Sequence, residues 1–209
     1  MPTACRVIIA DDHVAFRECV STMLAGCPAF DVIGQAGDGR ELLKLLKDEP
    51  APDVIILDLS MPRLGGLKAI RALRKDSPKV RVLVLTMHKE EDLLCQAFLE
   101  GADGYLLKDD WPTELLTALG TIRKSEGYVS PTAARALENP WLKIFIANKG
   151  SHFFEELSSQ ELEVLALLAK GESSSGIAHT LHITPHAVGH HQAAITRKLH
   201  VEDTPDLAR

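Results

Sequence analysis

Five short apolar runs alternate with five helix-like segments over the first 127 residues, and this alternation constrains the fold more than any other feature. Strands are predicted at 6–10, 30–34, 53–58, 81–86 and 104–108, and helices at 14–26, 39–48, 65–75, 90–100 and 111–126. Parallel neighbours need long crossovers, which helices supply. The last three runs lack polar alternation, so both sheet faces must be covered. We therefore expect a doubly wound α/β domain.

Polar side chains stand at the carboxyl ends of four of these strands. Asp11 and Asp12 follow the first strand, Asp58 ends the third, Thr86 ends the fourth and Lys108 ends the fifth. In open α/β sheets, ligand sites lie beyond these ends, where the strand order reverses. In the order 2-1-3-4-5 the first and third strands are neighbours, so three carboxylates would converge. Such a cluster needs a cation or a proton to hold it together.

Oxygen ligands with room for water and phosphate suit Mg²⁺ better than zinc, whose His and Cys ligands are missing from this half of the chain. An aspartate held against a divalent metal can act as the nucleophile in phosphoryl transfer. Lys108 supplies a positive charge and Thr86 a hydroxyl donor for phosphoryl oxygens. A single Asp after a strand is usually a helix cap or turn residue. The hypothesis therefore depends on all five residues occurring together.

The segments IIADDH, VIILDLSMP, VLVLTMH and GADGYLLKD resemble the receiver domain of bacterial two-component response regulators, from residue 5 to about residue 127. The resemblance implies a flavodoxin-like (βα)5 fold in which Asp58 accepts phosphate from the phosphohistidine of a sensor histidine kinase. It also implies that Asp12 binds Mg²⁺ directly and Asp11 largely through water. The backbone carbonyl of Ser60 would complete the protein ligands.

The same resemblance implies how phosphorylation changes the domain. Lys108 would pair with the acyl phosphate, Thr86 would move toward it, and Tyr105 would change rotamer with Thr86; packing alone would also explain Tyr105. The Gly65-Gly66 pair would shape the loop after the acceptor, where the backbone bends close to the metal. Such a domain catalyses only its own phosphorylation and dephosphorylation, so we do not expect a turnover enzyme.

The composition changes after this region. The predicted division is a receiver domain at 1–128, an interdomain linker at 129–155 and a helix-turn-helix domain at 156–209. A short helix is predicted at about 131–138. The stretch WLKIFIA is too apolar for a simple tether, so we expect it to dock on one of the domains. Trp141, Phe145, Phe153 and Phe154 are expected to pack between domains, which we favour over a partner site.

Three helix signals follow in the last part of the chain. Ser158 and Glu161 form a predicted capping box, and the apolar helix face that follows ends at Gly171. Ser173 starts a second short helix, and Pro185 stands in the first turn of a third. Two short helices, a tight turn and a longer third helix predict a small all-α helix-turn-helix domain, whose last helix would enter the major groove of DNA.

This part resembles the LuxR-type output domain that is attached to receivers in the NarL/FixJ group. The matching residues are Glu161, Val164, Leu165, Gly171, Ile177, Ala178, Leu181, Ile183, Val188, His191, Ile195, Lys198, Leu199 and Val201. The resemblance implies binding to double-stranded DNA as a homodimer formed on phosphorylation. The candidate DNA contacts are His186, Ala187, His190, His191, Thr196 and Lys198. The family's fourth helix, used for dimerisation, is expected to be truncated, which favours pairing through the receiver.

Departures from the family pattern concern the DNA-facing side. Ser174, Ser175 and Gly176 stand where the family has Asn-Lys-Glu, and Ala187 and Gly189 replace a threonine and a basic residue. Residues 156–209 hold four basic and seven acidic side chains, a net charge of 4 − 7 = −3 with histidines neutral. Because phosphate neutralisation supplies much of the affinity for DNA, this domain has few of the cations it would need.

Histidines partly offset this deficit. The domain contains six, at positions 179, 182, 186, 190, 191 and 200. Each could become charged against a polyanion, since unperturbed imidazoles titrate near neutral pH. His186 and His190 are four residues apart on one helical face, which is also metal-ligand spacing. Polar residues that face the DNA groove explain the same pattern.

Two functions fit these observations. The first is a transcription factor that is phosphorylated on Asp58 by a sensor histidine kinase and binds a two-fold DNA site. The second is a receiver-controlled protein-interaction regulator whose degenerate helix-turn-helix no longer binds DNA. We prefer the first. A hydrolase built on the aspartates is disfavoured, because its usual second carboxylate is replaced by Ser60.

The sequence also predicts where the protein works. No stretch approaches the roughly 18 to 20 apolar residues of a membrane helix, and MPTACRVIIADD turns acidic before a signal-peptide core could form. We expect a soluble, cytoplasmic protein without a membrane partner. Cys5, Cys19, Cys27 and Cys95 form no CxxC pair and are expected to be buried free thiols.

Overall fold

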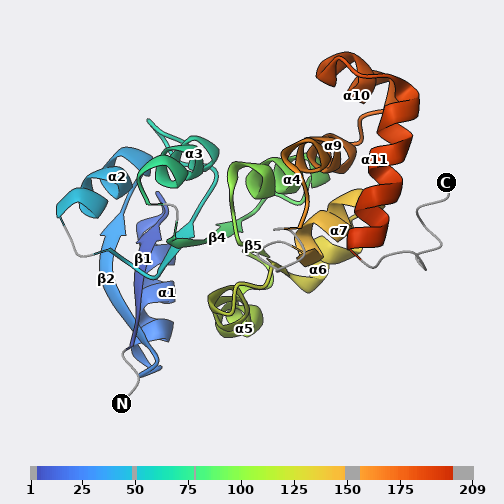
Figure 1. Cartoon of the computed structure of the whole chain (residues 1–209). Helices are drawn as coiled ribbons and strands as arrows, with labels where there is room; N and C mark the ends of the chain where they lie inside the picture. Colours follow the sequence, from blue (N-terminus) through green and yellow to red (C-terminus); the bar gives the residue numbers. More distant parts are fainter. Residues whose placement is uncertain (1–3, 49–50, 78, 149–155, 200–209) are drawn as a thin grey trace.

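The computed structural model describes residues 4–48, 51–77, 79–148 and 156–199. An all-parallel sheet of six strands forms the centre of the N-terminal domain (Figure 1). The strands are β1 (Cys5–Ala10), β2 (Phe30–Ala36), β3 (Val54–Leu57), β4 (Arg81–Thr86), β5 (Gly104–Leu107) and β6 (Tyr128–Val129). Their order is β2-β1-β3-β4-β5-β6, which confirms the predicted order of the first five.

The sixth strand was not predicted from the sequence. Tyr128–Val129 pairs in parallel with β5, in register Gly104↔Tyr128 and Tyr105↔Val129. A two-residue strand is too short to show hydrophobic alternation, so the pattern gave no signal for it. As a result β5 is an internal strand, and Tyr105 lies within the sheet rather than at its edge.

Helices cover both faces of the sheet, as the unbroken apolar strands require. They are α1 (Val14–Ala25), α2 (Gly39–Asp48), α3 (Gly66–Asp76), α4 (Glu91–Glu100) and α5 (Trp111–Arg123). Helices α1 and α5 enclose one apolar cluster against the sheet, and α2, α3 and α4 enclose the other. Because crossover helices cover both faces of the parallel sheet, the domain is doubly wound, which confirms the predicted fold class.

Five further helices follow the sheet within residues 131–148 and 156–199. They are α6 (Pro131–Arg135), α7 (Pro140–Asn148), α9 (Ser159–Ala169), α10 (Ser174–Leu181) and α11 (Pro185–Lys198). The capping box at the start of α9 is present, and Ser173 and Thr184 cap α10 and α11 through their side chains. The last three helices therefore form the predicted helix-turn-helix arrangement. The predicted truncated fourth helix lies outside the described residues.

The segment between the two domains contains more structure than the single helix predicted at about 131–138. The short helix ends at Arg135, and WLKIFIA belongs to α7, which packs against α9. Phe145 is buried and Trp141 is partly buried against the same apolar cluster. Phe153 and Phe154 lie outside the described residues. The apolar cluster under α4 continues through α7 into α9.

The described cysteines are free, as expected, but the expectation of burial is wrong for two of them. Cys5 and Cys95 are buried, whereas Cys19 is exposed and Cys27 is intermediate. Cys19 lies on the solvent side of α1, and Cys27 lies in the turn that follows this helix. Separately, none of the described helices is both long enough and apolar enough to cross a membrane.

Gly66 fixes the loop that carries Asp58. A Cβ atom at Gly66 would lie 2.3 Å from the backbone oxygen of Asp58 and 2.8 Å from the Cα atom of Leu59. The Gly66 amide also donates to the Leu59 carbonyl at 3.0 Å. Helix α3 can start this close to the end of β3 only because residue 66 has no side chain.

We expect Gly66→Ala to lower the free energy of unfolding by about 1–3 kcal/mol, because backbone atoms must move to relieve the overlap. Thermal denaturation followed by circular dichroism measures the effect. Gly120→Ala in α5 is the matched control: its Cβ would meet nothing within 4 Å, so this variant should be slightly more stable than the parent. Equal melting temperatures for Gly66→Ala and the parent would contradict the steric argument.

Candidate functional site

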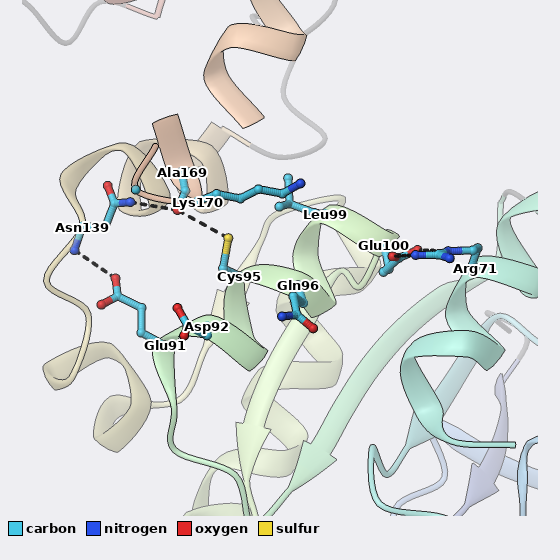
Figure 2. A pocket seen from close by; sticks show the side chains of 11 residues that line it. Arg71, Glu91, Asp92, Cys95, Gln96, Leu99, Glu100, Asn139, Ala169 and Lys170 are labelled. Carbon is cyan, nitrogen blue, oxygen red and sulfur yellow. Dashed lines mark hydrogen bonds and ion pairs between the residues drawn. The ribbon is translucent and has the colours of Figure 1, made fainter. Parts of the chain in front are cut away.

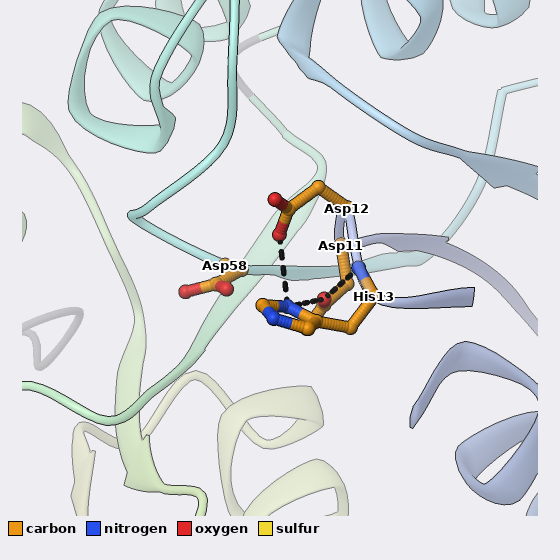
Figure 3. A group of neighbouring side chains, drawn as sticks. All are labelled: Asp11, Asp12, His13 and Asp58. Atoms are coloured by element: carbon orange, nitrogen blue, oxygen red, sulfur yellow. Dashed lines mark hydrogen bonds and ion pairs between the residues drawn. The ribbon is translucent and has the colours of Figure 1, made fainter. Parts of the chain in front are cut away.

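Three aspartates meet at the carboxyl ends of β1 and β3, and we call Asp11, Asp12, Asp58 and the adjacent His13 the acidic site (Figure 3). One potential ligand atom from each of these residues lies within 4.8 Å of the others. Asp11 and Asp58 are 2% and 3% exposed, whereas Asp12 and His13 are exposed. The site is therefore buried on one side and open to solvent on the other.

Backbone hydrogen bonds that extend the sheet position these aspartates. The Asp58 amide donates to the Ala10 carbonyl at 2.8 Å, and the Asp11 amide donates to the Ala36 carbonyl at 3.1 Å. Side-chain oxygens accept from nearby amides: Asp11 Oδ1 from His13 at 2.8 Å and Asp58 Oδ1 from Ser60 at 3.2 Å. The parallel register of β1 and β3 thus brings together carboxylates that are 47 positions apart in the sequence.

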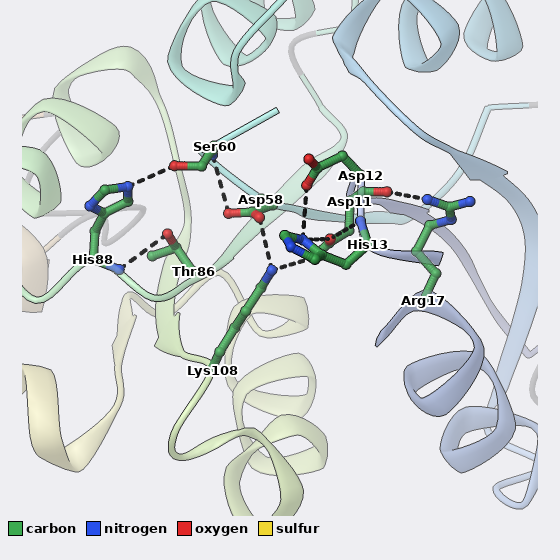
Figure 4. Close-up of polar contacts among 9 residues, drawn as sticks. All are labelled: Asp11, Asp12, His13, Arg17, Asp58, Ser60, Thr86, His88 and Lys108. Atoms are coloured by element: carbon green, nitrogen blue, oxygen red, sulfur yellow. Dashed lines mark hydrogen bonds and ion pairs between the residues drawn. The ribbon is translucent and has the colours of Figure 1, made fainter. Parts of the chain in front are cut away.

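The ammonium group of Lys108 lies between the two buried carboxylates (Figure 4). Its Nζ atom is 2.5 Å from Asp11 Oδ2 and 2.8 Å from Asp58 Oδ2, and it stands 4.6 Å from the ring centroid of Phe16. Burial disfavours the charged amine, but hydrogen bonds and charge attraction from Asp11 and Asp58 outweigh it and raise the pKa of Lys108. The lysine is therefore held protonated and offsets part of the negative charge.

The oxygen donors of the acidic site form a ligand set suited to a hard divalent cation. The Nδ1 atom of His13 is 3.0 Å from Asp12 Oδ1 and 3.3 Å from Asp11 Oδ1. The imidazole was not predicted as part of the site. The sequence does carry a signal for it, because His13 directly follows the aspartate pair.

A second group of predicted residues meets around His88, two residues after β4. Thr86 is fully buried, and its Oγ1 atom accepts from the His88 amide at 3.4 Å. Tyr105 is also fully buried, and its hydroxyl donates to the His88 carbonyl at 2.9 Å. Burial raises the pKa of Tyr105, so the phenol stays neutral and keeps this hydrogen bond.

The His88 ring continues the contact network on the other side. Its Nε2 atom is 2.7 Å from the hydroxyl oxygen of Ser60 (Figure 4). Its Nδ1 atom is 3.3 Å from Glu90 Oε2. His88 thus links the loop after Asp58 to the segment that starts α4. The sequence pattern did not indicate a role for His88, because its partner Ser60 lies 28 positions away in the loop after β3.

The N-terminal domain contacts the helix-turn-helix domain through α4 (Figure 2). Glu91 Oε1 accepts from the Asn139 amide at 2.9 Å, and the Asn139 side-chain nitrogen donates to the carbonyls of Leu168 and Ala169 at 2.9 and 2.8 Å. The thiol of Cys95 donates to the Ala169 carbonyl at 3.4 Å. These bonds satisfy the Ala169 carbonyl at the end of α9, and they give the Leu168 carbonyl a second donor beside the Gly171 amide.

A cavity of about 630 Å³ lies beside these bonds. Charged side chains of both signs line it, including Glu91, Asp92, Glu100 and Lys170. Most of its lining comes from α4 and from the end of α9, and Arg71 of α3 and Asn139 complete it (Figure 2). Any movement of α4 relative to α9 would therefore change its shape.

Helix α11 lies on the side of the C-terminal domain that faces away from the sheet (Figure 1). Of the predicted DNA contacts, His186 and His190 are exposed, and Ala187, His191, Thr196 and Lys198 are partly buried. Lys198 Nζ is 2.8 Å from Glu161 Oε2 and 3.1 Å from the Glu156 carbonyl. Its charge is therefore already paired inside the domain. Position in the sequence alone could not reveal this partner.

Glu161 is buried and accepts hydrogen bonds from Lys198 and from the Ser158 amide. Burial opposes ionisation of this carboxyl, but the bonds to Lys198 and Ser158 outweigh it and lower its pKa. The pKa of Glu161 is lower in the folded chain than in the unfolded chain, where it is about 4.3. The ionised carboxylate therefore stabilises the fold at pH values above about 4.3, and this stabilisation is lost as the pH falls through the folded-state pKa.

We expect Glu161→Gln to lower the melting temperature of the C-terminal domain at pH 7 and to reduce its loss of stability in acid. Melting curves of the full chain between pH 7 and pH 3 provide the measurement. Glu163→Gln is the control, because Glu163 is exposed on the same helix. The same pH dependence in Glu161→Gln and Glu163→Gln would argue against the ion pair with Lys198.

Both parts of the chain match known families. The description "Response regulator receiver domain" matches residues 7–120, and "Bacterial regulatory proteins, luxR family" matches residues 155–209. The chain is 33% identical to oxygen regulatory protein NreC of Staphylococcus carnosus over 97% of this chain and 94% of that protein. It is 35% identical to the probable transcriptional regulatory protein NarL of Mycobacterium tuberculosis, over 97% and 91%.

Solved structures agree with these matches. A structure of two RcsB dimers bound to two parallel DNAs covers 98% of this chain and 96% of its own, with 28% identity and a TM-score of 0.61. The signal receiver domain of the putative response regulator NarL from Mycobacterium tuberculosis covers 60% of this chain and 100% of its own. It is 38% identical, with a TM-score of 0.57.

Proposed function

Because this chain belongs to the family of response regulators that join a receiver domain to a LuxR-type regulatory domain, we propose that it is a transcription regulator switched by phosphorylation of Asp58. The observation that carries the proposal is the position of Asp58, with Lys108 Nζ at 2.8 Å and Asp11 and Asp12 beside it. Phosphate would come from the phosphohistidine of a sensor histidine kinase. Such a partner and a DNA target favour a cytoplasmic location.

The acidic site would hold Mg²⁺ through Asp12, Asp11, Asp58 and the backbone carbonyl of Ser60. The donor set supports this proposal, because oxygen ligands open to water on one side suit Mg²⁺. When bound, Mg²⁺ screens the negative charges of the carboxylate and the phosphate from each other. A carboxylate oxygen of Asp58 attacks phosphorus, the bond between phosphorus and the donor nitrogen breaks, and its electron pair stays on the imidazole.

Lys108 would follow the new charge. In the described state its ammonium divides its contacts between Asp11 and Asp58, and a phosphoryl group on Asp58 offers it stronger acceptors. Thr86 is buried next to the same strand ends and would donate its hydroxyl to a phosphoryl oxygen. That movement breaks the contact between Thr86 and the His88 amide, and Tyr105 would then lose its partner or move with the loop.

Helix α4 offers the route to the output domain. It begins at Glu91, immediately after the segment that contains His88. Its Cys95 bonds directly to the Ala169 carbonyl at the end of α9, and its Glu91 reaches α9 through Asn139. A change in the loop after β4 therefore acts on an element that already contacts the helix-turn-helix domain. We propose that phosphorylation loosens this contact and favours a homodimer of the chain on DNA.

A small phosphodonor with Mg²⁺ should add one phosphoryl group to the full chain, and Asp58→Asn should abolish the addition. Intact-protein mass spectrometry measures it. Asp12→Asn should slow the reaction at least tenfold because it removes a direct Mg²⁺ ligand. Asp31→Asn is the control, since Asp31 is an exposed carboxylate on β2. Unchanged addition in Asp58→Asn would refute the assignment of the acceptor.

The proposed DNA-binding surface has few positive charges to support it, and residues 156–209 carry a net charge of −3. The structure of RcsB with DNA supports a role for the matching domain, and we propose that α11 enters the major groove with His186, Ala187, His190, His191, Thr196 and Lys198 near it. Within the described part of α11, Arg197 is exposed, whereas Lys198 is paired with Glu161. Arg197 is therefore the better candidate for a phosphate contact.

Binding of the phosphorylated chain to random duplex DNA should fall steeply with salt, and Arg197→Gln should reduce the slope of log K against log salt by about one. Fluorescence anisotropy at several salt concentrations gives the slope. Lys170→Gln is the control, because Lys170 lies at the cavity between the domains and does not belong to α11. No binding and no salt dependence would favour the second function, a receiver-controlled regulator that binds another protein through this domain.

A further inference from the structure

Two exposed histidines on α11 face each other in a way that the proposed function does not require. The Nε2 atoms of His186 and His190 are 3.0 Å apart, their ring centroids are 4.5 Å apart, and the rings stand at 82°. Residues i and i+4 of a helix lie one above the other on the same face. The described part of the chain offers these two Nε2 atoms no hydrogen-bond partner other than each other.

This spacing fits two nitrogen ligands of one metal ion. With metal–nitrogen bonds of about 2.05 Å, two ligands on one ion are separated by about 2.9 Å at a right angle and about 3.4 Å at the tetrahedral angle. The measured 3.0 Å falls in this range. The approach is open to solvent, because His186 and His190 are both exposed.

We propose that His186 and His190 bind one transition-metal ion of the zinc, nickel or copper class. Imidazole nitrogens suit these ions, whereas Mg²⁺ prefers oxygen. The site is thus chemically distinct from the acidic site, where carboxylates provide most of the ligand atoms. The two lie in different domains, and rotation about the exposed side-chain bonds of His186 and His190 would point both lone pairs at one ion.

The ion would keep positions for other ligands. Among the described residues, His186 and His190 belong to no group of three or more potential ligands. A two-histidine ion therefore retains water molecules that phosphate oxygens can replace or contact. It also adds two positive charges to a region, residues 156–209, whose net charge is −3. If α11 enters the DNA groove as proposed above, the ion strengthens binding by supplying charge that the sequence lacks.

The first test is titration of the full chain with zinc chloride by isothermal calorimetry, in excess Mg²⁺ to fill the acidic site. We expect one zinc equivalent that is lost, or weakened at least tenfold, in both His186→Gln and His190→Gln. His191→Gln and His179→Gln are matched controls and should keep it. Circular dichroism checks that each variant retains its helices. Equal zinc uptake by the parent and the His186 and His190 variants would overturn the site.

The second test separates this site from the proposed function, on which the DNA effect rests. Micromolar zinc should raise the affinity of the parent chain for duplex DNA several-fold, and it should have no effect on His186→Gln or His190→Gln. Equal effects of zinc on all of these proteins would overturn the DNA role of the ion. DNA binding in the absence of zinc tests the proposed function separately. Binding by the parent chain without zinc supports the proposed function, and no binding contradicts it.

Discussion

The ammonium group of Lys108 holds the acidic site together. Two buried carboxylates from neighbouring strands could not remain ionised side by side without a cation, and Lys108 lies within hydrogen-bond distance of both. Because the same charge can follow a phosphoryl group, one interaction both stabilises the resting site and makes it responsive. The parallel sheet is what makes this possible: it brings residues from three distant parts of the chain to one edge.

The contacts around His88 show how a change at Asp58 can travel without a long rearrangement. Ser60, Thr86 and Tyr105 all touch this residue, and α4 starts three positions after it. The far end of the connection is equally local, since Glu91 reaches α9 through a single residue, Asn139. The coupling therefore depends on a few polar bonds set in a continuous apolar core, in which small shifts favour one of two packings rather than a gradual deformation.

The sequence predicted the strand order and the acidic site because both follow from long-range regularities. Unbroken apolar strands require a covered sheet, and strand ends in such a sheet converge whatever the loops do. Features set by local geometry were not predictable in the same way. The strand at Tyr128–Val129 is too short to show a pattern, and the partners of His88 and Lys198 come from elements distant in sequence. The apolar stretch WLKIFIA docks on the C-terminal domain as predicted, but its helical conformation as α7 was not predicted.

In the C-terminal domain, a positive charge that could contact DNA is used to stabilise the fold. Lys198, one of its few cations, neutralises the buried Glu161 and so stabilises the domain instead of extending toward a ligand. A buried carboxylate left unpaired would be costly, so this lysine cannot move to a phosphate without a comparable loss inside the domain. The exposed polar side chains on α11 are the imidazoles of His186 and His190 and the guanidinium of Arg197, and imidazole nitrogens can bind metal ions. Recognition by this helix is therefore expected to depend on what the histidines bind as much as on the fixed charges of the chain.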